Sequence, residues 1–85
     1  MAERNARAQP SAGLVKRSFS LAGHRTSVAL EPEFWSALGQ IAAARGQTVS
    51  ALVAEVDAGR TVLRPLASEL RLLALKWFSD WVADR

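Results

Sequence analysis

The sequence contains no cysteine and a single histidine, His24. Without cysteine there is no disulfide framework and no thiolate ligand, and one histidine cannot complete a metal site. A nucleophile paired with a base would have only His24 to use. No glycine-rich phosphate loop of either common type is present. We therefore expect no metal, no cofactor and no enzymatic activity.

Long apolar runs are also absent. The longest stretch without a charged residue is 34–44, which is shorter than the roughly 20 residues of a membrane-spanning helix. Charged residues at positions 3, 4 and 7 stand near the N-terminus with no apolar segment behind them, so no secretory signal is expected. These features predict a soluble, cytoplasmic protein of bacterial type that does not enter a membrane.

The chain is short, at 85 residues, but hydrophobic residues make up 49% of it. That content excludes a wholly disordered chain. A domain of this size buries only somewhat more than about 60% of its unfolded surface and is often marginally stable alone. With disulfides and metals excluded, self-association is the leading way to add stability.

Positive charge is concentrated at the N-terminus. Residues 1–25 hold five basic residues and one acidic residue, whereas residues 26–85 hold six basic and seven acidic ones. A basic arm on a nearly neutral body favours a polyanionic partner, and nucleic acid over anionic lipid. The alternative is an arm that serves only to keep the protein soluble.

The first thirty residues divide into a tail and a strand region. Residues 1–13 have one large apolar side chain, which predicts a flexible basic tail followed by a single domain at 14–85. Residues 14–30 alternate between apolar and polar, as half-buried strands do. The apolar phase shifts across Ala22, Gly23 and His24. This pattern predicts either one bent strand or two short ones, with the strand at about 25–30 better defined.

Three amphipathic helices follow, at 32–45, 49–58 and 65–81. Pro32 and Pro65 stand where a first helical residue is expected, and Thr48 is a suitable N-cap. The third helix carries an apolar stripe that we expect to be buried against the other two. The stripe consists of Leu66, Leu70, Leu73, Trp77 and Trp81.

A lone strand would leave backbone groups unpaired at its edges. The predicted solution is a mainly helical, intertwined homodimer, in which one strand from each chain forms an intermolecular antiparallel two-stranded ribbon. The third helix is appended to this arrangement. The expected dimer core is Val28, Leu30, Phe34, Leu38, Ile41, Leu52 and Val56. The opposite face of such a ribbon fits the major groove of B-DNA.

Two sequence runs resemble a known family. Residues 16–27, KRSFSLAGHRTS, are followed by LEPEFW at 30–35, a helix, Gly46, and Thr-Val-Ser at 48–50. This series resembles the ribbon-helix-helix proteins, and in particular a small bacterial group of probable DNA-binders. The resemblance covers about residues 16–78. The segment before Gly23 and the third helix lie outside the minimal fold of that family.

The resemblance implies roles for particular residues. Alternate strand positions that face the groove fall on Arg25, Ser27 and Ala29. An arginine can bond a guanine bidentately and serine suits either role, whereas Ala29 can at most touch a thymine methyl. The start of the second helix falls where the family clamps a phosphate with backbone N–H groups, at Thr48, Val49 and Ser50. Lys16 and Arg17 are also expected to reach phosphates.

The resulting functional expectation is a sequence-specific transcriptional regulator, and specifically a repressor. A homodimer would insert its ribbon into the major groove of double-stranded DNA. The alternative is a protein-interaction module, such as an antitoxin or an adaptor. In that case the helix at 65–81 would bind a second protein and DNA contact would be secondary.

Overall fold

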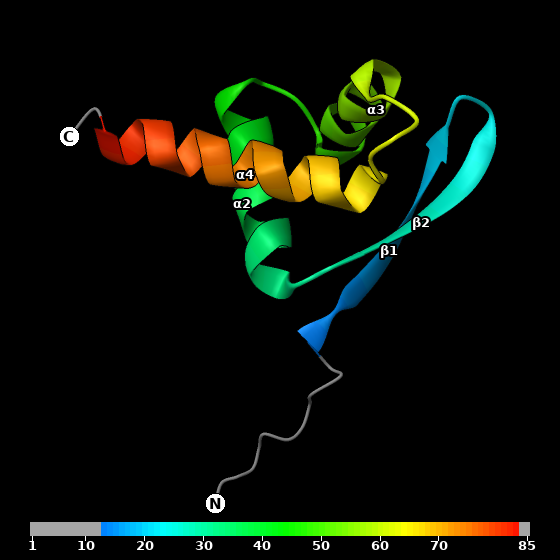
Figure 1. The fold of residues 1–85 in the computed structure, drawn as a ribbon, viewed down its shortest axis with the longest axis horizontal. Helices are drawn as coiled ribbons and strands as arrows, with labels where there is room; N and C mark the ends of the chain where they lie inside the picture. Colours follow the sequence, from blue (N-terminus) through cyan, green and yellow to red (C-terminus); the bar gives the residue numbers. More distant parts are fainter. Residues whose placement is uncertain (1–12, 84–85) are drawn as a thin grey trace, which may run out of the picture.

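The computed structural model describes residues 13–83 and contains a β-hairpin followed by three helices (Figure 1). The hairpin extends along one side of the molecule, and α4 crosses α2. All of the tail predicted at 1–13 except Gly13 lies outside the described residues. The elements are β1 (Val15–Leu21), β2 (His24–Leu30), α2 (Pro32–Ala44), α3 (Val49–Gly59) and α4 (Leu66–Ala83).

The antiparallel two-stranded ribbon is present, and both of its strands belong to one chain. β1 pairs with β2 along its whole length, from Val15 opposite Leu30 to Leu21 opposite His24. The sequence left open whether residues 14–22 form a second strand, and the structure shows that they do; the expected pairing between two chains stays a prediction. β1 pairs with β2 through a two-residue turn: Ala22 and Gly23 have φ of 52° and 83°, as the hairpin turn whose twist matches paired strands requires.

The helices lie close to the predicted ranges because their start and stop signals act locally. Pro32 opens α2 and Gly46, at φ 68°, follows its last turn, as a residue with no Cβ can do without strain. The Thr48 side chain accepts a hydrogen bond from the backbone N–H of Ala51 at 3.0 Å and so caps α3. No helix within residues 13–83 has the length and apolar content needed to cross a membrane.

One chain closes its own hydrophobic core. The inner face of the hairpin contributes Phe19, Leu21, Val28 and Leu30. Of the residues expected in a dimer core, Val28, Leu30, Leu38, Ile41 and Leu52 are buried within the single chain, and Phe34 and Val56 are half-buried. The helices complete the core with Trp35, Ala37, Leu38, Ile41, Ala42, Leu52, Val53, Leu66, Leu70 and Ala74.

The first half of α4 packs on α2 and α3, and the second half extends past them (Figure 1). Leu66, Leu70 and Ala74 are buried, whereas Trp81 is 50% exposed and Leu75 is 61% exposed. The prediction that the whole stripe is buried is therefore wrong for Trp81. The buried face of α4 ends where α2 no longer covers it, so the last turns carry apolar residues into solvent.

Candidate nucleic-acid interface

The outer surface of the hairpin is polar, and both strands build it. Directly opposite residues of an antiparallel pair share one face of the sheet. The register places Lys16 opposite Ala29, Ser18 opposite Ser27, and Ser20 opposite Arg25. We call this surface the ribbon face; it consists of Lys16, Ser18, Ser20, Arg25, Ser27 and Ala29. All six are exposed except Ala29, which is half-buried.

Cross-strand hydrogen bonds organise the ribbon face. The Arg25 guanidinium donates from Nη1 to the Ser20 hydroxyl at 3.0 Å. The hydroxyl oxygens of Ser18 and Ser27 lie 3.3 Å apart in a second hydrogen bond. An arginine has five N–H donors in a planar fork, so one bond to Ser20 leaves the other donors available for a ligand.

The hairpin is uniformly positive. Residues 14–30 include Lys16, Arg17 and Arg25 and no acidic residue. None of these three forms an ion pair with a residue in 13–83, whereas each of the cations that follow α3 or lie on α4 does so. Those pairs are Arg60–Asp57, Arg64–Glu69, Arg71–Glu31 and Lys76–Asp80. Unneutralised charge on a narrow projecting element attracts polyanions.

Arg17 does not share the ribbon face. It stands opposite Val28 on the inner side of the hairpin, and its guanidinium lies 4.8 Å from the ring centroid of Trp35. The Trp35 indole N–H donates to the Val15 carbonyl oxygen at 2.7 Å, and Phe19 packs on the same indole at 5.8 Å between ring centroids. Trp35 therefore fastens β1 to α2 and fixes the position of the ribbon.

The start of α3 is the second expected contact point. Its first-turn N–H groups at Val49 and Ser50 have no acceptor within the helix, while the Thr48 hydroxyl already accepts from Ala51. Thr48 and Ser50 are exposed and Val49 is half-buried. α3 packs against β1, but no hydrogen bond or ion pair within residues 13–83 joins its start to the ribbon face.

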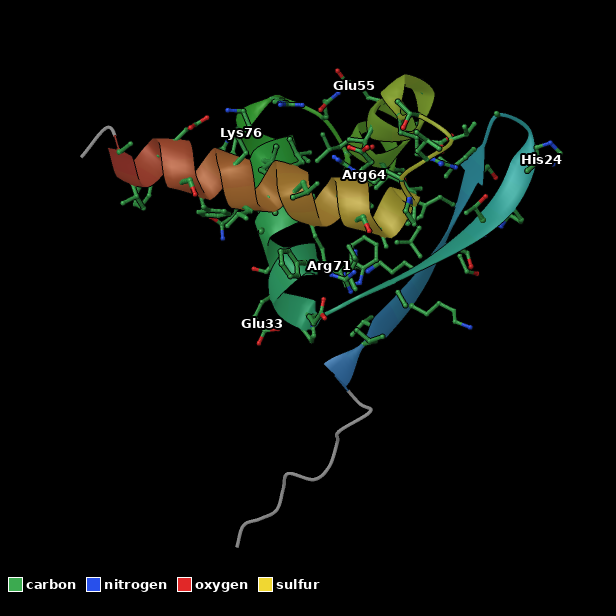
Figure 2. The ribbon with its side chains drawn as sticks, in the orientation of Figure 1. His24, Glu33, Glu55, Arg64, Arg71 and Lys76 are labelled. Atoms are coloured by element: carbon green, nitrogen blue, oxygen red, sulfur yellow. The ribbon has the colours of Figure 1, made fainter. Side chains whose placement is uncertain are left out.

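The junction between the ribbon and α2 is tied to α4 by one ion pair. Arg71 donates to the Glu31 carboxylate at 3.0 Å and lies 5.8 Å from the Phe34 ring centroid. Hydrogen bonds from the backbone N–H of Glu31 and from Arg71 lower the pKa of Glu31 below its usual value. The carboxylate thus stays charged through the neutral range. Figure 2 shows Arg71 below α4, between the lower part of α2 and the hairpin.

Sequence reasoning brought together three of the six ribbon-face residues and missed Ser18 and Ser20. Lys16, which the sequence assigned to phosphate contact, stands opposite Ala29 on the ribbon face, and its contact with DNA stays a prediction. The available signal was the alternation of Ser18 and Ser20 with Phe19 and Leu21. Fixing the turn at Ala22 and Gly23 would have set the register and aligned both strands.

No group of three or more histidine, cysteine or acidic side chains within the described part of the chain is arranged to hold a metal ion. His24 begins β2 just after the turn and is exposed. Its side chain projects into solvent from the far end of the hairpin (Figure 2).

Comparison with known proteins gives one family and one solved structure. Residues 14–78 match the model of the ribbon-helix-helix domain. The chain is also similar to the solved structure of an uncharacterized protein from Bordetella pertussis Tohama I, with 31% sequence identity and a TM-score of 0.75. That similarity covers 93% of this chain and 67% of the other. A search of curated proteins found no match.

Proposed function

The chain belongs to the ribbon-helix-helix family, and from this premise we propose that it is a double-stranded DNA-binding transcriptional repressor. Domains of this family are generally DNA-binding transcription regulators or antitoxins, and they are typically not enzymes. The proposed ligand is B-form duplex DNA, with the ribbon face directed at the base edges of the major groove.

The observation that carries this proposal is the composition of the ribbon face. It combines three hydroxyls with two cations that form no ion pair inside 13–83, and no acidic residue lies within 14–30. A two-stranded ribbon fits a major groove about 12 Å wide. Arginine and lysine are the usual partners of guanine O6 and N7, and serine can pair with any base edge.

Arg25→Ala tests the proposal directly. Arg25 is exposed, and its one hydrogen bond within the described chain is to Ser20, so we expect the variant to fold normally. Loss of a bidentate base contact should reduce discrimination between the preferred and scrambled duplexes by about 1–3 kcal/mol per ribbon engaged. Fluorescence polarisation with both duplexes at two salt concentrations measures this difference.

Lys76→Ala is the matched control. It removes the same unit of charge from α4, and Lys76 lies far from the hairpin tip marked by His24 (Figure 2). We expect it to weaken binding to both duplexes slightly and equally, because it alters only the long-range field. Equal discrimination by Arg25→Ala and wild type would show that the ribbon does not read sequence.

Phosphate contacts complete the proposed interface. We assign them to the N–H groups at the start of α3, at Val49 and Ser50 beside the Thr48 cap, and to the positive charge of Arg17. Phosphate contacts position a protein on DNA without reading sequence. Charge removal at such positions should therefore lower affinity for all duplexes alike and reduce the salt dependence.

We also propose that the protein acts as a homodimer, because ribbon-helix-helix domains generally bind DNA as dimers. Support for the dimer comes from the family, since the single chain already buries a hydrophobic core of its own. Sedimentation equilibrium should give twice the chain mass at micromolar concentration. A monomer that still binds DNA would reject the dimer and leave the ribbon assignment intact.

A second candidate function is a protein-interaction module such as an antitoxin or adaptor. The observation that favours it is the apolar surface on the outer half of α4, where Leu75 and Val82 are more than 60% exposed. Between α2 and α4 lies a groove of about 430 Å³ lined mainly by Phe34, Ala37, Ala74, Leu75 and Phe78. If Leu75→Asp leaves DNA binding unchanged yet abolishes capture of a co-purifying protein, this candidate gains over the repressor.

A further inference from the structure

We infer that the second half of α4 is a docking surface for the same surface of a second copy of this chain. The two helices pair antiparallel, and side chains of each helix fill a hollow on the other. This contact is separate from the ribbon and does not depend on DNA binding. Added to the proposed homodimer, it joins two dimers into an assembly of four chains.

The first argument is a hollow on the side of α4. Its volume is about 410 Å³, and all of its lining residues belong to α4. We call this surface the α4 face; it consists of Leu75, Phe78, Ser79, Val82 and Ala83. The first four stand at i, i+3, i+4 and i+7, so they are neighbours on the helix surface. Four such residues form the hole into which a facing helix inserts one side chain.

The α4 face also supplies side chains that can fill such a hole. Leu75, Phe78 and Val82 follow the alternating spacing of three and four that marks the seam of a coiled coil. Leu75 is 61% exposed and Val82 is 62% exposed. Phe78 is half-buried, and Trp77 packs edge-on against it at 4.8 Å between ring centroids. A surface with both hole and filling side chains is self-complementary, as contact between identical copies about a two-fold axis requires.

The charges near the α4 face favour a second copy as the occupant. Residues 72–83 contain two charged side chains, Lys76 and Asp80, and these pair with each other at 3.3 Å. Neither of them lines the hollow. In Figure 2, Lys76 lies on the upper side of α4, whereas Glu33 lies below α4 at the foot of α2. Two copies can therefore meet without net repulsion and without burying an unpaired charge.

The groove between α2 and α4 sets the direction of pairing. This groove shares Leu75 and Phe78 with the hollow. From there it continues along α2, past Phe34 and Ala37. An antiparallel partner brings its own Val82 to the groove, because positions before and after Phe78 then face each other. A parallel partner would place Val82 beside Val82 and leave the groove empty, so antiparallel pairing covers more apolar surface.

The size of the surface predicts a weak contact. Residues 72–82 span about 15 Å of a helix that is about 10–12 Å wide with its side chains, which gives a face of less than about 200 Å² in projection. A stable complex buries about 800 Å² on each partner. Even with the groove added, the α4 contact falls in the weak, transient class. We therefore expect it to form well above the micromolar concentrations at which the proposed homodimer forms.

The first experiment follows mass by sedimentation equilibrium from micromolar to millimolar protein. We expect the wild-type mass to double over this range. Leu75→Asp places a charge at the contact in both copies and should weaken the association about a hundredfold or more, so its mass should stay constant. Val82→Asp, in the last turn of α4, should behave in the same way. Circular dichroism should show both variants folded, because both residues are largely exposed.

Leu63→Asp is the matched control, since it makes the same substitution at a leucine that is 91% exposed between α3 and α4. It should associate as wild type does. A wild-type mass that stays constant up to millimolar protein overturns the inference. Association of Leu75→Asp at wild-type concentrations also overturns it, and so does loss of association in Leu63→Asp, which would show that the contact is not specific to the α4 face.

The proposed function fails with a different result. A monomer at micromolar concentration whose mass doubles on concentration rejects the proposed homodimer and keeps the α4 contact. A dimer at micromolar concentration that never doubles keeps the homodimer and rejects the α4 contact. Loss of DNA binding changes neither mass.

The second experiment tests the direction by crosslinking. The chain has no cysteine, so each variant carries one thiol. Val82→Cys is mixed with Ser36→Cys, whose position lines the groove on α2, and the mixture is treated with a short bifunctional maleimide. We expect a crosslink between the two different chains, identified by mass spectrometry of tryptic peptides. Lys76→Cys mixed with Ser36→Cys is the control and should give little product. Crosslinks between two Val82→Cys chains, with none to Ser36→Cys, would reject antiparallel pairing and with it the inference.

Discussion

Trp35 is the side chain on which the placement of the ribbon depends most directly, and its replacement has a calculable cost. It is 4% exposed, and its indole contacts β1 through the Val15 carbonyl at 2.7 Å and through Phe19. Truncation of a buried tryptophan to alanine costs about 3–5 kcal/mol. We expect Trp35→Ala to lose that much stability, a large part of the roughly 5–15 kcal/mol typical of a domain.

Trp35→Phe divides this cost into parts. Phenylalanine keeps an aromatic ring in the core but cannot donate to Val15, and a lost hydrogen bond typically costs about 0.5–1.5 kcal/mol. For a domain of this length each kcal/mol shifts Tm by about 4–8 °C. Stability should decrease from wild type to Trp35→Phe and then to Trp35→Ala. Urea unfolding followed by circular dichroism measures it, with an unchanged m-value for all three proteins.

Trp81→Ala is the control, because Trp81 is 50% exposed near the end of α4. Surface substitutions usually stay within about 0.5 kcal/mol, so this variant should unfold close to wild type. The reasoning is refuted if Trp35→Ala loses less than about 1 kcal/mol, or if Trp81→Ala loses as much as Trp35→Ala. The first result would mean that β1 does not pack on α2 through this indole, and the second that the loss of stability does not follow burial.

Two further predictions concern the turn and the ion pair beside α2. Gly23 has φ 83° and open space around it, so Gly23→Ala should cost about 1–2 kcal/mol of stability through the backbone alone. Ala22→Asn should instead raise Tm, because Asn-Gly suits this turn. Equal Tm values for the two variants would contradict the role of the turn. The pKa of Glu31 is lowered in the folded protein. The Glu31 carboxylate therefore stabilises the fold fully above its usual pKa of 4.5, and this stabilisation is lost as the pH falls through the lowered pKa of the folded protein. Glu31→Gln should therefore lose less stability than wild type between neutral and acid pH in unfolding titrations, and an identical pH dependence would reject the Glu31–Arg71 contribution.

The helices were predictable from the sequence because their determinants are local. Pro32 and Thr48 act within one turn of the helices they start, and each helix lies within two residues of the expected range. The phase of α2 was less predictable. The expected core included Phe34 and did not include Trp35, but β1 covers Trp35, and the helix therefore buries Trp35 and leaves Phe34 half-buried.

The extent of the α4 stripe could not be read from periodicity either. The spacing of Leu66, Leu70 and Trp81 is regular, yet the first two are buried and Trp81 is 50% exposed. Helical spacing shows which residues share a face, and it does not show how far the neighbouring helices extend along that face. α4 is longer than both helices on which it packs, and its last residues, 79–83, are exposed.

The source of the second ribbon strand is the least predictable feature, because a strand edge presents the same N–H and C=O groups to any partner. What decides between β1 and a second copy is the cost of bringing the strands together. Closing a loop of two residues restricts little chain, whereas association of two chains loses roughly 4–15 kcal/mol of translational and rotational freedom. Once Ala22 and Gly23 allow the turn, β1 is always beside β2 at high effective concentration. A partner strand that took the place of β1 would have to displace β1 along its full length and break the Trp35–Val15 hydrogen bond as well.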